Sequence, residues 1–250
     1  MYDTDVRGLL HSSVVPIVRY TQRLMSSRIR VFASSVGTKL LIGVTGLALF
    51  LFLVTHIAGN ALIFLGPTTF NNYSHLLTSN PLIPVIEIVL LLVFLIHIYK
   101  TVTMFLRNQQ ARPVGYRTRK SQGAPSRKSV SSTTMIVSGL WLLIFVVVHV
   151  TTFKYGPEYP SSVDGVRDLY RLVAENFHNP LVVVFYVVSM LLVGSHLWHG
   201  ASSSFQSLGL SHPRWTPGIL TLGKVFAVLI GGGFILITLY VHIVSRQVGQ

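Results

Sequence analysis

Long apolar stretches, separated by short polar segments, set the predicted architecture of the chain. Asp, Glu, Lys and Arg are absent from residues 40–86, 129–153, 176–213 and 225–245. An apolar run of about 18 or more residues is long enough to cross a membrane as a helix. Proline and glycine punctuation predicts five spans, at about residues 39–64, 82–106, 134–153, 181–203 and 219–244. The pattern predicts an all-α polytopic membrane protein with one domain over residues 36–246, and it excludes a soluble core.

The few charges are distributed unevenly between the two ends of the spans. Charged residues make up 11% of the chain, and the net charge is +13. Five arginines lie in the arm over residues 1–35, and seven basic residues without an acid lie in the loop over residues 107–133. This bias predicts a cytoplasmic N-terminus and, after five spans, an outer C-terminus. It indicates a basic collar beside lipid, not nucleic-acid binding, and the arm lacks the apolar core of a signal peptide.

Four of the five predicted spans contain histidine at interior positions. A histidine in a span is costly to bury and indicates a functional site unless a neighbouring helix satisfies it. Counted from the span midpoints, His56 and His149 lie toward the outside, and we call them the outer layer. His97 and His196 lie toward the cytoplasm and form the inner layer. With about 1.5 Å of rise per residue, the two layers are about 14 Å apart.

Two histidines at one depth on facing helices can bind one haem iron from opposite sides. The two layers therefore predict two haems stacked across the membrane, with four helices bundled around them. The chain has no cysteine, which excludes disulfides, thiolate-bound iron–sulfur clusters and haem attached through CxxCH. Taken singly, each histidine is equally well explained as a core residue hydrogen-bonded to a neighbour.

Some residues near the two layers have more than one interpretation. His199 lies one turn beyond His196 and is the alternative inner ligand. Gly46 and Gly139 lie near the depth of the inner layer, where they leave room for a porphyrin edge or for close helix packing. No internal repeat is evident. The remaining histidines fall in loops or at helix ends, where we expect solvated surface: His11, His75, His178, His212 and His242.

Several short motifs carry a resemblance to a known family. They are Ser34-Ser35 followed by Lys39, Thr55–Asn60 (THIAGN), Phe70–His75 (FNNYSH), Arg112–Tyr116 (RPVGY) and His196–Gly200 (HLWHG), which continues through Ser204–Pro213. In these motifs, and in the order and number of spans, residues 34–243 resemble the five-helix, dihaem cytochrome b membrane anchor of succinate dehydrogenase/fumarate reductase. One departure is Thr38, where we expect a basic residue before Lys39.

The resemblance implies an anchor and electron-transfer subunit of a complex in the bacterial cytoplasmic membrane. A flavoprotein subunit and an iron–sulfur subunit would bind its cytoplasmic face. Two haem b groups would carry electrons between succinate/fumarate and menaquinone or ubiquinone. Helices one and three would ligate the outer haem and helices two and four the inner haem, in agreement with the two layers. Ser35 and Lys39 are then candidates for contact with an inner quinone, and the fifth span would contribute packing and no iron ligand.

Glu87 is the only acid within a predicted span. It precedes His97 by ten residues, which predicts a position about 15 Å further outward, beside the outer layer. A carboxyl in a span is costly unless it is paired, protonated or in contact with water. Glu87 is equally well explained as a carboxyl hydrogen-bonded to a neighbouring helix and as a proton relay for a quinone near the outer haem.

Three alternatives are left open. One is another dihaem, quinone-reactive cytochrome b, although a common type places two histidines on each of two helices. The second is a transporter or a non-redox anchor, although neither inverted repeats nor broken helices are evident. The third is a member of the same family that has lost its haems. The sequence does not distinguish the quinone, the direction of electron flow, or whether complexes form trimers.

Overall fold

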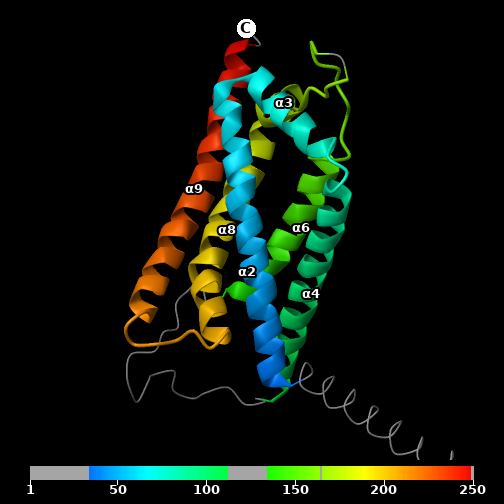
Figure 1. Cartoon of the computed structure of the whole chain (residues 1–250). Coiled ribbons are helices and arrows are strands. Elements are labelled where there is room, and N and C mark those ends of the chain that lie inside the picture. Colours follow the sequence, from blue (N-terminus) through cyan, green and yellow to red (C-terminus); the bar gives the residue numbers. More distant parts are fainter. Residues whose placement is uncertain (1–33, 112–133, 164, 249–250) are drawn as a thin grey trace, which may run out of the picture.

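The structure, a computed structural model, describes residues 34–111, 134–163 and 165–248 (Figure 1). Five of the described helices are long and apolar enough to cross a membrane. They are α2 (Ser35–Asn60) with its continuation η1 (Ala61–Leu65), α4 (Ile83–Gln110), α6 (Met135–Phe153), α8 (Pro180–Ser207) and α9 (Thr216–Val248). The predicted all-α fold with five spans is confirmed. Most of the basic arm and of the basic loop lies outside the described residues.

Local chemistry sets where these helices begin and end. Ser34 caps α2, because its hydroxyl accepts a hydrogen bond at 3.0 Å from the backbone amide three residues further on. Asn179 caps α8 in a similar way at 2.9 Å, and Pro180 is the first residue of that helix. The first span stops at Gly66, whose φ of 93° favours a residue without a side chain. Pro180 and Gly66 confirm the proline and glycine punctuation expected at these two boundaries.

Four helices form a ring, and the fifth packs against its outside (Figure 1). α2 contacts α4 and α8, and α6 contacts the same two helices. α2 and α6 therefore lie on one diagonal of the ring, and α4 and α8 lie on the other. Large apolar side chains are exposed along all five spans, as expected where lipid replaces water. We call the end of the bundle at which α2 begins the inner end, and the opposite end the outer end.

Small residues allow α8 and α9 to approach closely. A Cβ atom on Gly231 of α9 would lie 3.2 Å from the Gly194 Cα of α8 and 3.1 Å from the Met190 carbonyl oxygen. Backbone atoms cannot move aside as a flexible side chain does, so this crossing requires glycine. Close approach through small residues is a common way to join helices in a membrane. The packing expected of the fifth span is thus present in the structure.

Two shorter helices, α3 (Pro67–Thr78) and α7 (Leu169–His178), lie at the outer end. The buried Asn71 side chain joins them. Its nitrogen donates to Asp168 Oδ1 at 2.8 Å, and its oxygen accepts from the Tyr170 amide at 2.8 Å. The sequence predicts loops for both segments, and this prediction is wrong. For α7 the signal is an apolar spacing typical of a helix, at Leu169, Leu172, Val173 and Phe177.

Candidate functional site

The structure brings the two outer-layer histidines together across a diagonal of the ring. His56 of α2 and His149 of α6 have ring centroids 5.9 Å apart, with the ring planes at 88°. A metal–nitrogen bond to histidine is about 2 Å long, so two imidazoles on opposite sides of one metal ion have centroids about 6 Å apart. The separation therefore fits two axial ligands of one metal.

Aromatic rings surround the outer layer. Phe52 stacks on His56 with 5.1 Å between centroids, and Phe145 stacks on His149 with 5.5 Å. Three more rings complete the surround: Phe153, Tyr186 and Phe234. Flat apolar faces therefore hold the outer imidazoles and keep water away from them.

The hydrogen-bonding groups beside the outer imidazoles do not select which ring nitrogen carries the proton. The Tyr186 hydroxyl lies 3.3 Å from Nδ1 of His149, and a hydroxyl can donate or accept. Asn60 Nδ2 donates to the backbone oxygen of His56 at 2.8 Å and makes only a long contact, 3.4 Å, with Nδ1 of that residue. Packing is therefore the main constraint on this layer.

Each inner-layer histidine faces a hydroxyl on a neighbouring helix. Thr45 Oγ1 of α2 lies 3.1 Å from Nδ1 of His97 on α4. Ser138 Oγ of α6 lies 3.1 Å from Nδ1 of His196 on α8. Both hydroxyl residues are buried, and the two imidazoles are close enough to interact electrostatically. The structure thus places His97 and His196 in one region, and hydrogen bonds orient their rings.

A glycine follows each of these hydroxyl residues in the sequence, and it lies beside the imidazole that the hydroxyl faces. A Cβ atom on Gly46 would lie 3.2 Å from Cε1 of His97, and one on Gly139 would lie 3.7 Å from Cε1 of His196. The first distance is tighter than an ordinary contact, whereas the second is ordinary van der Waals contact. Both glycines lie at the depth predicted for them, and Gly46 is the more constrained of the two.

α2 and α6 share a short sequence pattern at three positions. A hydroxyl residue and a glycine precede the outer-layer histidine, with nine residues between: Thr45-Gly46 before His56, and Ser138-Gly139 before His149. The eleven-residue step from hydroxyl to histidine covers about 16 Å, close to the predicted separation of the layers. Each of these helices therefore supports an inner histidine and supplies an outer one, and this pattern is the signal that identifies Thr45 and Ser138.

The contacts favour His196 over His199 as the inner-layer residue of α8. The Ser138 hydroxyl faces His196, whereas His199 is only half-buried. Within the described part of the chain, no hydrogen bond reaches the His199 imidazole, and only its backbone oxygen accepts one, from Ser202. His199 therefore lacks the support that both inner-layer histidines share.

The other histidines lie away from the two layers. The exposed positions expected for three of them are confirmed: His75, His178 and His212. The expectation for His242 is wrong, because its Nδ1 donates to the Phe177 carbonyl oxygen at 2.6 Å and ties α9 to α7. His11 lies outside the described residues.

Glu87 forms an ion pair with Lys154, which joins the outer parts of α4 and α6. Lys154 follows His149 by five residues, about 7.5 Å further outward along the helix. The ion pair thus places the Glu87 side chain at the outer end of the bundle, where its spacing from His97 predicts it. Its side chain is 43% exposed in the isolated chain. A carboxyl in a span is less costly when it is paired, protonated or in contact with water. The structure shows Glu87 paired with Lys154.

Ser35 and Lys39 lie one turn apart at the start of α2, and both are exposed. Thr38, next to Lys39, is buried, with 4% of its surface exposed. A buried position accounts for a small hydroxyl residue where a basic one is expected, because an unpaired buried charge is costly. Both quinone candidates thus remain accessible at the inner end of the bundle.

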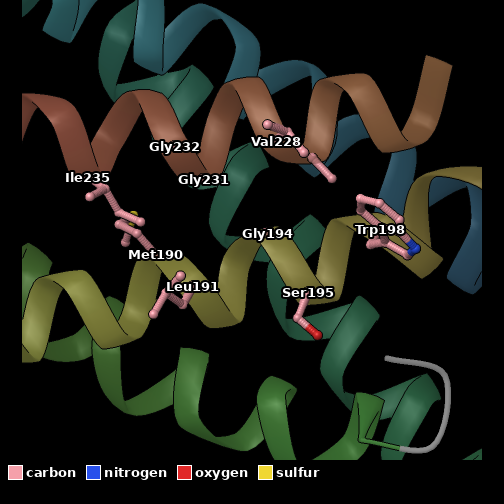
Figure 2. Close-up of a pocket in the computed structure, with 10 residues that line it drawn as sticks. Met190, Leu191, Gly194, Ser195, Trp198, Val228, Gly231, Gly232 and Ile235 are labelled. Atoms are coloured by element: carbon pink, nitrogen blue, oxygen red, sulfur yellow. The ribbon is translucent and has the colours of Figure 1, made fainter. Parts of the chain in front are cut away.

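A separate groove of about 570 Å³ lies between α8 and α9 (Figure 2). Apolar side chains and glycines line most of it, with Trp198 near one end and Ile235 near the other. Ser195 also lines the groove, but none of the four layer histidines does. The groove therefore lies outside the candidate site.

Comparison of the chain with protein-family models, with curated proteins and with solved structures gives no match. Among the described residues, no group of three or more His, Asp or Glu side chains is placed to hold a metal ion. Haem requires fewer protein ligands, because the porphyrin itself supplies four and leaves two axial positions. The fold and the geometry thus define a five-helix membrane protein with two imidazole pairs in its interior.

Proposed function

We propose that this chain is the dihaem cytochrome b subunit of a succinate dehydrogenase or fumarate reductase. It would anchor the complex in the bacterial cytoplasmic membrane and connect the iron–sulfur subunit with a membrane quinone. The observation that carries the proposal is the arrangement of four imidazoles, one from each helix of a ring, as two pairs. The resemblance of the sequence motifs to this family supports the same conclusion.

The residues of each layer fit a haem b group. His56 and His149 would hold the outer haem, and their 5.9 Å centroid separation suits two ligands of one iron. His97 and His196 would hold the inner haem, and hydroxyls at their Nδ1 atoms leave the Nε2 atoms to bind. Bound haem supplies one-electron transfer, which two groups at successive depths extend across the membrane.

Position and charge support the proposed partners and quinone contacts. The basic arm and the basic loop at 107–133 would face the cytoplasm, where the flavoprotein and iron–sulfur subunits bind. Ser35 and Lys39 would contact a quinone at the inner end. At the outer end, the Glu87 carboxyl would exchange a proton with a quinone oxygen, with Lys154 beside it as the counter-charge.

The proposal is tested by purifying the full-length chain with its complex and quantifying haem as the pyridine haemochrome. We expect two haem b groups per chain and a reduced-minus-oxidised spectrum typical of six-coordinate, low-spin haem. A folded but colourless protein would contradict the proposal and favour a non-redox anchor or transporter. One haem per chain would contradict the assignment of a ligand pair to each layer.

A further inference from the structure

The hydroxyl that faces each inner imidazole has already committed its only proton. Thr45 Oγ1 donates to the Leu41 carbonyl oxygen at 2.6 Å, and Ser138 Oγ donates to the Met135 carbonyl oxygen at 3.1 Å. A hydroxyl has one proton to donate and two lone pairs that accept. Toward an imidazole nitrogen 3.1 Å away, each hydroxyl is therefore left as an acceptor. The proton of that hydrogen bond must come from Nδ1 of the histidine.

A second pair of side chains in the bundle has the same arrangement, and there the direction of the hydrogen bond is unambiguous. The indole nitrogen of Trp141 donates to Ser189 Oγ at 2.9 Å, and an indole N–H can only donate. Ser189 Oγ in turn donates to the Phe185 carbonyl oxygen, one turn earlier, at 2.7 Å. A buried, back-bonded hydroxyl thus serves as an acceptor for a ring N–H elsewhere in this protein.

The Thr45 hydroxyl has a second carbonyl acceptor on its own helix. Its Oγ1 lies 3.2 Å from the Ile42 carbonyl oxygen, in addition to the Leu41 carbonyl oxygen at 2.6 Å. A carbonyl oxygen can only accept, so both contacts direct the Thr45 proton toward α2 and away from His97.

We infer that Thr45 and Ser138 are positioning residues that hold both inner imidazoles in the tautomer with the proton on Nδ1. A neutral imidazole has one N–H and one lone pair, so a proton on Nδ1 leaves the lone pair on Nε2. Nε2 is then the atom prepared to bind a metal, and the hydrogen bond at Nδ1 raises the basicity of the ligand. The inference rests on the proposed haem-binding function and specifies how the protein prepares the inner site.

The two hydroxyls come from different helices and serve the two sides of one site. Thr45 lies on α2 and Ser138 on α6, and neither helix supplies an inner-layer histidine. Removal of either hydroxyl should therefore affect the same haem. Tyr186 faces the outer layer instead, so its replacement should leave the inner site unchanged. This shared target separates a positioning role from a general effect on folding.

The variants that test this inference are Ser138→Ala and Thr45→Val, each in the full-length chain with its complex. Thr45→Ser and Ser138→Thr keep the hydroxyl and should restore the properties of the native chain. Thr238→Val is the matched control, because Thr238 is buried and donates to the Phe234 carbonyl at 2.9 Å but lies on α9, away from the inner layer.

Two readouts are needed, the midpoint potential of each haem and the protonation of the histidine ring nitrogens. Loss of the hydrogen bond makes the imidazole a weaker donor to iron, so the midpoint potential of the inner haem should rise and that of the outer haem should not. Haem retention at the inner site should weaken by about 10- to 100-fold, as is typical when such a partner is removed. Nitrogen-15 spectra of histidine-labelled, haem-free protein in lipid should show the Nδ1–H form at both inner histidines, and its loss at His196 in Ser138→Ala, because without iron at Nε2 the ring proton is free to move.

Each outcome decides between the inference and its failure. Unchanged potential and unchanged nitrogen spectra in both variants overturn the inference, even if two haems are present. Equal shifts at both haems also overturn it, because they indicate a general change of structure. If the native chain contains no haem, the proposed function fails. The nitrogen spectra of the haem-free chain then still decide whether the two hydroxyls set the tautomer.

Discussion

The inner and outer histidine pairs are held by different kinds of side chain. Hydroxyls and glycines flank the inner imidazoles, and the hydroxyl protons are committed to backbone carbonyls. Aromatic rings stack on the outer imidazoles, and the Tyr186 hydroxyl beside His149 can act as donor or acceptor. Stacking fixes the plane of an imidazole, whereas a hydrogen bond also decides which nitrogen carries the proton. One bundle therefore uses two separate means of orienting the same kind of ligand.

Replacement of an inner histidine should have the largest effect. His97→Leu or His196→Leu should remove the inner haem and leave most of the outer haem signal, because the outer layer has its own ligands and its own packing. Pyridine haemochrome quantitation and reduced-minus-oxidised spectra measure the loss. His199→Leu is the control and should retain both haems. Retention of both haems in His196→Leu, with loss in His199→Leu, would move the ligand to His199 and break the comparison.

Replacement of Glu87 should affect quinone chemistry at the outer end without touching either layer. Glu87→Gln preserves shape but cannot exchange the carboxyl proton, so most quinone-linked turnover should be lost. Both haems and succinate oxidation with a soluble dye should be unchanged. Glu158→Gln, on the exposed loop beyond α6, is the matched control. Normal quinone turnover in Glu87→Gln would leave Glu87 with only its ion pair to Lys154.

Added side chains at the two glycines should sharpen the description of the inner layer. Gly46→Val should displace the His97 ring, because even a Cβ atom would lie 3.2 Å from Cε1. Overpacking of this kind costs about 1–3 kcal/mol, which should lower the inner haem content measurably. Gly139→Ala should be tolerated, because its Cβ would meet His196 at an ordinary 3.7 Å. Equal loss of the inner haem in both variants would contradict the unequal spacing, and haem content per chain is the measurement.

Removal of the Tyr186 hydroxyl should have the smallest effect. Tyr186→Phe keeps the ring that packs against His149 and removes one hydrogen bond, worth about 0.5–1.5 kcal/mol. Both haems should be retained, with a small change of midpoint potential confined to the outer haem. A change as large as that of Ser138→Ala would show that the outer layer depends on hydrogen bonding as strongly as the inner one. Potentiometric titration of both variants under the same conditions makes this comparison.

The sequence predicts the spans and the histidines because both depend on patterns along the chain. Apolar length marks the membrane helices, and the depth of a histidine follows from its place within a span. The partner of a side chain depends instead on how two helices are rotated about their axes. For that reason, neither the Thr45 and Ser138 contacts nor the pairing of Glu87 with Lys154 follows from spacing alone. The hydroxyl–glycine–histidine pattern of α2 and α6 becomes informative once the neighbouring helices are known.

The helices at the outer end are harder to predict, because their contacts also join residues that are distant in the sequence. α3 and α7 are too short and too polar to resemble membrane spans, so only local spacing identifies them. Asn71 joins them through hydrogen bonds to residues 97 and 99 positions away in the sequence. A contact between residues so far apart in the sequence does not affect the hydrophobic periodicity around Asn71.

The close crossing of Gly194 and Gly231 has a consequence for the order in which the protein is assembled. α9 follows the other four spans in the chain, so during synthesis α8 enters the membrane before its closest neighbour exists. Until α9 arrives, α8 is held by α2 and α6 but lacks its close crossing with α9, and a turn of one residue would carry His196 about 100° away from the ring interior. The helix that supplies neither layer with a histidine is therefore the one that completes the packing around α8, and we expect the inner site to form fully only when this span is inserted.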